Sequence, residues 1–350
     1  MREYPAFDWL RLVLASVVFW VHAGFLQSYS AAGNFAVQVF FALSGWLIGG
    51  IIMQMTASDF PRFFYNRVTR IWLPYVAAVA LLYLTAVVKD GFAPYFWENL
   101  AYDLTLTHNL FIQKVPAVVE ALPMGGTGAH LWSIAVEEQF YLMAPLLIVL
   151  TPLGKSWTAW AFVTAFAILL GTWYGSVSAG VLAVMLQRRF GDWHLTNPAT
   201  AFLVCLGVLT GSLLMAGLAN YQYAAPIVAV VVVLLLARPG ERRSIGIWAG
   251  GISYPMYLNH WTGLFAASAL VSLLPQLGRF TAATGGFVFA LIVSTAAYSL
   301  IDRNVQRYRG QFYTAGLGRS AMISAYVLMA VGLILGNLVI GPLSASASAP

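Results

Sequence analysis

The stretch HLWSIAVEEQFYLMAPLL, residues 130–147, places two neighbouring carboxylates, Glu137 and Glu138, in an otherwise apolar run. The apolar segment around them, residues 131–151, is about as long as the ~20 residues that a helix needs to cross a bilayer. The rest of the chain has the same character, because 60% of its 350 residues are hydrophobic and only 9% are charged. Such a composition does not provide a water-soluble surface. We therefore predict an all-α fold, a polytopic transmembrane helix bundle.

Hydropathy along the chain marks eleven candidate membrane helices. They cover residues 9–28, 35–55, 71–88, 131–151, 157–174, 178–190, 199–218, 222–237, 246–271, 283–301 and 320–341. Because segment 178–190 is short for a span, we predict 10–11 membrane helices. If all eleven cross and the N-terminus is cytoplasmic, fifteen of the eighteen Lys and Arg residues lie on the cytoplasmic side, in keeping with the positive-inside rule. We expect a multi-pass protein of the inner, cytoplasmic membrane, whose net charge of +6 needs no nucleic-acid partner.

The chain shows no internal repeat or linker, and we expect one membrane domain over residues 1–342. The end of the chain, SASASAP, is of low complexity and predicts a disordered tail over residues 343–350. The longest connection between apolar segments, about residues 89–130, contains WENLAYDLTLTHNLF. We expect a helix that lies on the membrane surface there, either as a plain amphipathic helix or as the roof of a site.

Five polar side chains fall at similar depths within the candidate spans. A helix rises ~1.5 Å per residue, which places all five between the midplane and the outer third of the bilayer. They are His22, Ser44, Glu137, Glu138 and His260. An ionisable group at such depth costs at least ~2.5–3.5 kcal/mol, so it normally faces a polar partner or a water-filled cavity. These residues are candidates for one site, although each histidine and glutamate could also be a structural hydrogen-bonding group.

Five sequence blocks, taken in order, resemble the acyltransferase-3 family of membrane-bound acyltransferases. They are FDWLRLVLASVVFWVH, VQVFFALSGWLI, RFFYNRVTRIWLPY, HLWSIAVEEQFYLMAPL and ISYPMYLNHW, spread over residues 7–261. The resemblance implies an integral membrane O-acyltransferase that moves an acetyl or short acyl group from cytoplasmic acetyl-CoA to a sugar hydroxyl of a surface polysaccharide, a lipopolysaccharide or a lipid-linked glycan. Many family members carry an esterase-like domain after the membrane part. Here the chain ends soon after its last apolar segment, so we expect that a second transfer step either uses another protein, such as a glycan-assembly protein, or does not exist.

The resemblance also assigns residues, block by block. The first-helix arginine and histidine become Arg11 and His22, which stand eleven residues, or three helical turns, apart on one face. The basic residues expected to hold the phosphates of acyl-CoA are Arg11, Arg62, Arg67 and Arg70, although positive-inside anchoring would explain the last three equally well. The residues expected to bind the acceptor are Ser44, Trp132, Tyr254, Tyr257 and His260. Ser44 could instead allow close helix packing or act as a nucleophile.

The expected catalytic residues are His22, Glu137 and Glu138. A buried imidazole suits the removal of a proton from an attacking hydroxyl, and one glutamate could orient it. His22 could act directly as the base or carry the acyl group transiently. No close metal-ligand spacing such as His-x-x-x-His is present, so no metal is expected. The alternative function is a proton-coupled transporter or flippase of a glycan or lipid precursor, which would also use intramembrane charges.

Overall fold

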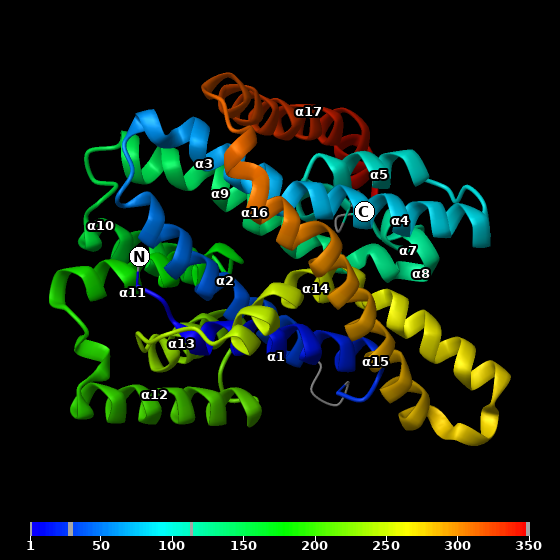
Figure 1. Cartoon of the computed structure of the whole chain (residues 1–350), viewed down its shortest axis with the longest axis horizontal. Helices are drawn as coiled ribbons and strands as arrows, with labels where there is room; N and C mark the ends of the chain where they lie inside the picture. The colour runs from blue at the N-terminus through cyan, green and yellow to red at the C-terminus, as the bar shows by residue number, and fades with distance from the viewer. Residues whose placement is uncertain (1, 27–30, 113–114, 348–350) are drawn as a thin grey trace. The chain divides into compact units, whose positions relative to one another are not determined.

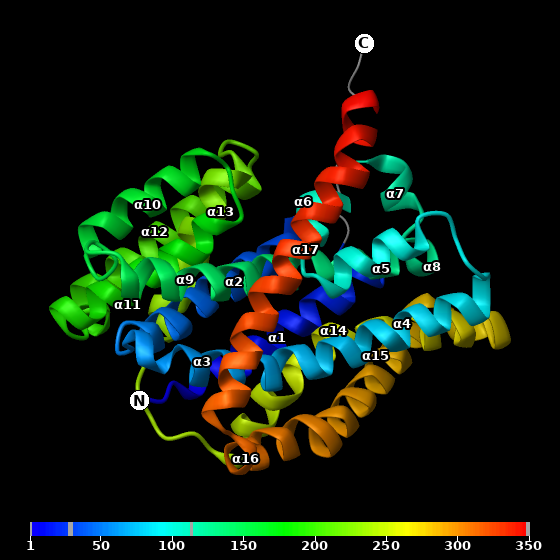
Figure 2. The same ribbon diagram turned by 90° about the horizontal axis from the view of Figure 1, so that it is seen from above.

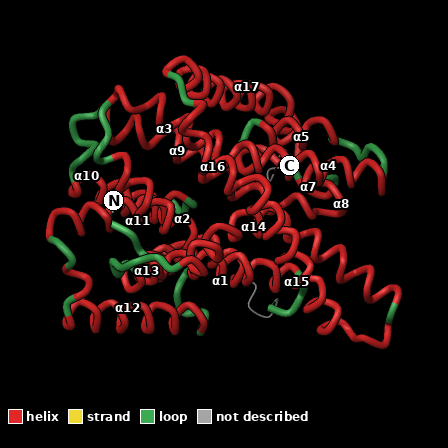
Figure 3. Tube along the Cα trace, viewed as in Figure 1, coloured by secondary structure: helices red, strands yellow, loops and turns green. Residues whose placement is uncertain are grey.

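The computed structural model describes residues 2–26, 31–112 and 115–347. Throughout these ranges the chain forms helices joined by loops, and no strand occurs (Figure 3). Seven helical stretches in the described residues are long and apolar enough to cross a membrane, and two further apolar helices, Trp157–Leu169 and Tyr221–Leu236, are shorter. The predicted all-α, polytopic fold is confirmed, whereas the orientation of the N-terminus stays a prediction.

The helices gather into two compact units, each formed by two separate parts of the chain. The first unit comprises Met1–Met55 and Ala144–Leu300, and the second comprises Thr56–Met143 and Ile301–Pro350. Helix α9, Trp132–Leu150, contributes its first part to the second unit and its last turns to the first.

The first unit contains the remaining helices of its two chain segments. They are α1 Pro5–His22, α2 Ala31–Ile52, α10 Trp157–Leu169, α11 Tyr174–Phe190, α12 Asn197–Met215, α13 Tyr221–Leu236, α14 Ser244–Leu273 and α15 Gly278–Ala297. Short 3-10 turns, Trp193–Leu195 and Pro275–Leu277, precede α12 and α15. Helix α14 packs along both α15 and α1, and α2 packs along α11 (Figures 1 and 2).

Small residues allow α2 and α11 to pack backbone against backbone. A Cβ atom on Gly45 would overlap the carbonyl oxygen of Val177, and one on Gly180 would overlap that of Ala42. Small residues permit such close approach of apolar helices. Because Gln38 contacts Ser176 and Gly50 contacts Arg188, the two helices run in the same direction. This direction is the one expected of the second and sixth candidate crossings, so it supports the short segment 178–190 as a crossing.

A Schellman motif ends α1 directly after His22. The amide of Phe25 donates to the carbonyl of Trp20, the amide of Gly24 donates to that of Val21, and Gly24 has a φ of +88°. The ring of Phe25 packs edge-on against Trp20, 5.7 Å away, which is the apolar contact that often accompanies this motif. The sequence predicts a helix that continues to residue 28. The cap stops it six residues earlier, and residues 27–28 lie outside the described ranges.

The second unit contains one long interrupted helix, a group of short helices and two C-terminal helices. They are α3 Phe60–Arg67, α4 Leu73–Asp90, α5 Phe96–Leu104, α6 His108–Phe111, α7 Pro116–Glu120, α8 Pro123–Gly126, α16 Arg303–Phe312 and α17 Ala315–Ala347. A π-helical segment, Val68–Trp72, joins α3 to α4, and a second one, Tyr298–Asp302, precedes α16. The 3-10 turns Ala57–Asp59 and Thr127–Leu131 precede α3 and α9.

The connection over residues 89–130 differs from the predicted surface helix. It forms α5 to α8, which enclose a small core of their own, made of Tyr102, Phe111, Ile112, Val115, Val118 and Leu122. Leu106 has a positive φ of +59°, and Pro116 and Pro123 each begin a new helical turn, so no single helix can continue. At the other end of the unit, α17 extends to Ala347, beyond residue 343 where the sequence predicts a disordered tail. Residues 348–350 lie outside the described ranges.

Candidate active site

In the first unit, the last residue of α1 meets the middle of α14. Nδ1 of His22 lies 2.8 Å from Nε2 of His260, and the two rings stack with centroids 4.9 Å apart and planes inclined by 18°. His260 is buried, with 2% of its surface exposed, whereas His22, at the end of its helix, is an exposed residue. The structure therefore brings together two predicted site residues that are 238 positions apart in the sequence.

The hydrogen bonds of His260 determine which nitrogen of each neutral ring carries the proton. Nδ1 of His260 lies 2.8 Å from the carbonyl oxygen of Tyr257, which can only accept a hydrogen bond. Nδ1 of His260 is therefore the donor, and its Nε2 has the lone pair. That lone pair accepts from Nδ1–H of His22, so the lone pair of neutral His22 lies on Nε2. An imidazole held in one tautomer in this way suits general-base chemistry.

An ion pair between half-buried Arg242 and buried Asp8 aligns α1 with α14 at their N-terminal ends. Arg242 donates from Nε and Nη2 to the two carboxylate oxygens of Asp8, at 2.6 and 2.8 Å. These hydrogen bonds raise the pKa of the Arg242 guanidinium. A Cβ on Gly250 would overlap the Asp8 carboxylate, so a glycine is needed there for the close approach. Because Asp8 lies beside Gly250 and His22 beside His260, the two helices run in the same direction.

The other predicted residues of the first unit lie on three helices. Nη1 of Arg11 lies 3.8 Å from Oδ1 of Asp8, so this predicted cofactor ligand belongs to the ion-pair cluster at the start of α1. Tyr257 is buried on α14 and packs edge-on against Phe40 of α2, 6.0 Å away. Tyr254 is half-buried on α14, six residues before His260. Half-buried Ser44 precedes Gly45 at the close α2–α11 contact.

The two glutamates of the second unit have different partners. Glu138 is buried, and its Oε2 accepts a 2.6 Å hydrogen bond from Nε1 of Trp72, which belongs to the π-helical segment. Its Oε1 is buried and has no hydrogen-bond partner among the described residues. Glu137 is half-buried and accepts a hydrogen bond from the hydroxyl of Tyr141. An unpartnered buried carboxylate oxygen is costly, which marks Glu138 as a functional candidate.

The predicted phosphate-binding arginines of the second unit lie near aromatic rings. The Arg67 guanidinium lies 5.5 Å from the ring centroid of Tyr141, the partner of Glu137, and that of Arg62 lies 4.2 Å from the centroid of Tyr313. Arg70 lies in the π-helical segment, and Trp132 is the first residue of α9. A stacked guanidinium keeps its N–H edge available for an anion. His22 belongs to the first unit and both glutamates to the second, so the predicted contact between them stays a prediction.

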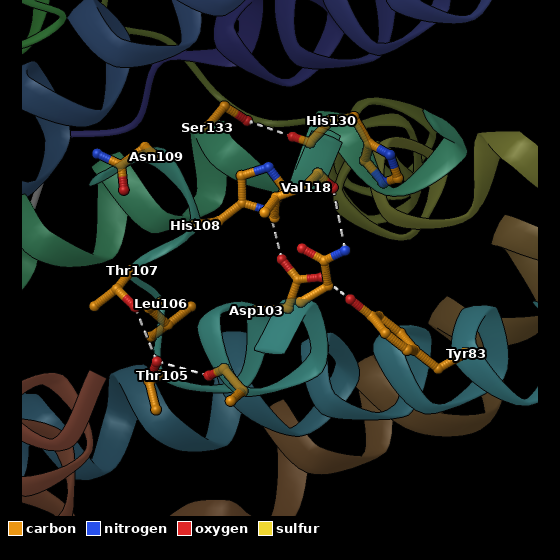
Figure 4. Close-up of polar contacts among 12 residues, drawn as sticks. Tyr83, Asp103, Thr105, Leu106, Thr107, His108, Asn109, Val118, His130 and Ser133 are labelled. Atoms are coloured by element: carbon orange, nitrogen blue, oxygen red, sulfur yellow. Dashed lines mark hydrogen bonds and ion pairs between the residues drawn. The ribbon is translucent and has the colours of Figure 1, made fainter. Parts of the chain in front are cut away.

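A buried aspartate–histidine pair in the second unit was not among the predicted site residues. Nδ1 of His108 lies 2.6 Å from Oδ1 of Asp103, and the hydroxyl of Tyr83 donates to Oδ2 at 2.7 Å (Figure 4). The hydroxyl of Tyr75 donates to the main-chain carbonyl of Asp103, and both members of the pair are at most 1% exposed. From the sequence, His108 looks like a loop residue. Its separation of five residues from Asp103 gives no helical face, and only the turn at Leu106 brings the two together.

No cluster of three or more His, Cys, Asp or Glu side chains that could hold a metal ion occurs in the described part of the chain. The two imidazoles of the histidine pair are suited to proton transfer and nucleophilic attack.

Comparisons with known proteins place the chain in a family. The family profile described as an acyltransferase domain matches residues 4–299. One relative comes from Komagataeibacter xylinus and has the provisional name membrane-bound transacylase BcsY. It is 25% identical over 365 aligned residues, which cover 95% of this chain and 90% of the relative. The peptidoglycan O-acetyltransferase OatA of Listeria monocytogenes is 27% identical over 157 residues, and the O-acetyltransferase OatA of Staphylococcus aureus is 27% identical over 164.

Each of these two alignments covers 42% of this chain but only about a quarter of the relative, 24% and 25%. No solved structure matches the chain. The family match covers most of the chain, including His22, Glu137, Glu138 and His260. The chain therefore belongs to the acyltransferase-3 family of membrane-bound acyltransferases.

Proposed function

We propose that the protein is an O-acyltransferase of the cytoplasmic membrane, which transfers an acetyl or short acyl group from cytoplasmic acyl-CoA to a sugar hydroxyl of a surface polysaccharide or lipid-linked glycan. The family and the relatives indicate an acyltransferase. The observation that carries the finer proposal is the contact of His22 with His260, because it gives an imidazole whose Nε2 has the lone pair.

In the proposed reaction, Nε2 of His22 accepts the proton of the sugar hydroxyl while the hydroxyl oxygen attacks the thioester carbonyl carbon. The carbon–sulfur bond then breaks, and the imidazolium returns the proton to the leaving thiolate. The products are the O-acyl sugar and free coenzyme A, and no other reactant is needed. His260 acts as a positioning residue, since its Nε2 holds the proton of His22 on Nδ1. We favour this direct transfer over an acyl-histidine intermediate.

The other predicted residues receive roles that agree with their surroundings. The ring-stacked Arg62 and Arg67, with Arg70, are proposed to hold the diphosphate of the donor, which pairs well with planar guanidinium groups. The unpartnered Oε1 of Glu138 is proposed to accept a hydrogen bond from a hydroxyl of the acceptor. Tyr254, Tyr257, Ser44 and Trp132 remain proposed acceptor contacts, and Arg11 is proposed to support the start of α1 through Asp8.

Release of coenzyme A tests the proposal. The purified protein would be incubated with acetyl-CoA and a membrane glycolipid extract, and wild type would be compared with His22→Ala and His22→Gln. Ser16→Ala is the matched control, because Ser16 lies on the same helix and its hydroxyl donates to the local carbonyl of Leu12. We expect extract-dependent release that both His22 variants lose and the control keeps, with all variants eluting as folded protein.

Two results would contradict the proposal. A wild type that releases no coenzyme A from several acyl-CoAs and moves a glycan precursor across vesicles would support the transporter or flippase alternative. Full activity of a folded His22→Gln protein would exclude His22 as the base. To separate the two chemical routes, acetyl-labelled acetyl-CoA without acceptor would be mixed with wild type and acid-quenched. Label retained on the protein would contradict direct transfer.

A further inference from the structure

A cavity of about 390 Å³ opens in the first unit, away from the histidine pair. It lies where the segment before α1 meets the C-terminal ends of α2 and α11. The polar and aromatic side chains that line it are Arg2, Tyr4, Trp46, Gln54, Gln187 and Arg188. Its volume lies within the range of about 300–1,000 Å³ that is usual for small-molecule pockets. None of these residues has a role in the proposed reaction so far.

Both charged residues that line the cavity are arginines, and each is anchored on one side. Nη2 of Arg188 donates to the carbonyl of Gly50 at 2.6 Å, and Nη1 of Arg2 donates to Oδ1 of Asp192 at 2.5 Å. The same carboxylate oxygen accepts from Nε2 of Gln187 at 2.7 Å. A guanidinium has five N–H donors, so one anchor fixes its position and leaves donors for an anion. The charge of Arg2 is balanced by Asp192, whereas Arg188 is anchored by a neutral carbonyl, so the cavity has a net positive charge that favours an anionic group such as a phosphate.

The aromatic side chains add a surface for a flat ring. Tyr4 is half-buried and packs edge-on against buried Trp46, with ring centroids 5.9 Å apart. The side-chain amides of Gln54 and Gln187 line the same cavity and can both donate and accept hydrogen bonds. This combination of side chains suits a nucleotide, because arginines can bind its phosphate and the aromatic rings and amides can bind its planar base. A phospholipid headgroup would use the arginines but offers no planar base.

We propose that this cavity binds the adenosine end of the acyl-CoA donor with its ribose 3′-phosphate. The inference rests on the proposed function. Tyr4 directly precedes α1 and His22 ends it, about 27 Å further along for 18 residues. The flexible arm of coenzyme A would then run beside α1 from the cavity to the base. With the expected cytoplasmic N-terminus, the cavity lies on the side of the membrane that holds acyl-CoA.

Direct binding of adenosine 3′,5′-bisphosphate, the end of coenzyme A without its arm, tests the cavity independently of turnover. The full chain in a phosphate-free, non-ionic detergent would be titrated calorimetrically, and the KM for acetyl-CoA would be measured separately. We expect Arg188→Gln and Arg2→Gln each to weaken binding and raise KM about tenfold, with smaller changes in kcat. Arg188→Lys, which keeps the charge, should be intermediate. Arg189→Gln is the control, because Arg189 neighbours Arg188 without lining the cavity.

The possible outcomes separate this inference from the proposed function. One outcome is that wild type releases coenzyme A while Arg188→Gln and Arg189→Gln both have the same KM and nucleotide affinity as wild type. In that case the cavity assignment is wrong, and the proposed transferase function is retained. If the nucleotide binds in an Arg188-dependent way but no thioester is consumed, the nucleotide site stands and the transferase does not. If only phosphatidylglycerol vesicles bind in an Arg188-dependent way, the cavity is a lipid site and the inference is overturned.

Discussion

Nδ1 of His22 lies 2.8 Å from Nε2 of His260, and the carbonyl of Tyr257 accepts a hydrogen bond from Nδ1 of His260, which keeps the proton of the His260 ring on Nδ1. Removing His22 should lower kcat by about 10²–10⁴, the usual contribution of a general base. His260→Ala should lower kcat by about tenfold to a hundredfold with little change in KM for acetyl-CoA, because one orienting hydrogen bond is lost.

A conservative substitution distinguishes positioning from packing at residue 260. His260→Gln keeps a side-chain oxygen that can accept from His22, so it should recover part of the kcat that His260→Ala loses. Steady-state kinetics over a range of pH would show this, since the rate should fall in acid as His22 gains a proton and loses its lone pair. Equal kcat values for the two folded variants would argue against a role in orienting His22.

Glu138→Gln should separate the charge of this residue from its structural hydrogen bond. The glutamine carbonyl oxygen can still accept from Nε1 of Trp72, so we expect the free energy of unfolding to change by less than about 1 kcal/mol. Turnover should fall at least tenfold, because the buried Oε1 would no longer be part of a carboxylate. Thermal unfolding in detergent and coenzyme A release measure the two effects, and unchanged turnover would assign Glu138 a purely structural role.

The aspartate–histidine pair of the second unit should contribute strongly to stability. Asp103→Ala leaves His108 and the Tyr83 hydroxyl buried without their acceptor, at a cost of about 3–5 kcal/mol. Tyr83→Phe removes one hydrogen bond and should cost about 1–2 kcal/mol. Thr85→Ala is the control on the same helix, because its exposed hydroxyl binds only the local carbonyl of Leu81. Unfolding temperatures that match the control would contradict this prediction.

The Asp192 carboxylate should give the first unit a pH-dependent contribution to stability. Its hydrogen bond from Gln187, together with Arg2, holds the pKa of Asp192 below its usual range. A pKa that is lower in the folded state than the usual ~3.9 stabilises the fold above that pH, and the stabilisation is lost as pH falls through the folded-state pKa. Asp192→Asn should therefore unfold at a lower temperature than wild type at pH 7. A difference that persists when the pH is far enough below ~3.9 to protonate Asp192 in both states would point to another cause.

Hydropathy predicted the helices well because membrane insertion depends on local composition. Each of the eleven apolar segments overlaps a helix, including the short segment that pairs with α2. Helix ends depend on single residues instead, and the stop after His22 comes from Gly24 and the Trp20–Phe25 contact. The division into two compact units was not visible from composition, since both units have the same apolar character.

The motifs identified His22 and His260 as candidates, but the sequence did not show that they touch. Their contact depends on the packing of α1 along α14, which Asp8, Arg242 and Gly250 align from the other end. Asp103 and His108 could not be predicted to form a pair, because their spacing fits neither one face of a helix nor a known motif. Only the left-handed turn at Leu106 makes them neighbours, and no sequence rule assigns that conformation to leucine.

The cap at the end of α1 means that the position of the reactive imidazole depends on the number of residues in the helix. Asp8 fixes one end of the helix and Gly24 the other, with His22 on the last helical position between them. One residue inserted between Asp8 and His22 would turn the ring by about 100° and shift it by about 1.5 Å, enough to break its contact with His260. The length of this helix should therefore tolerate neither insertion nor deletion, even where its individual apolar side chains can be exchanged.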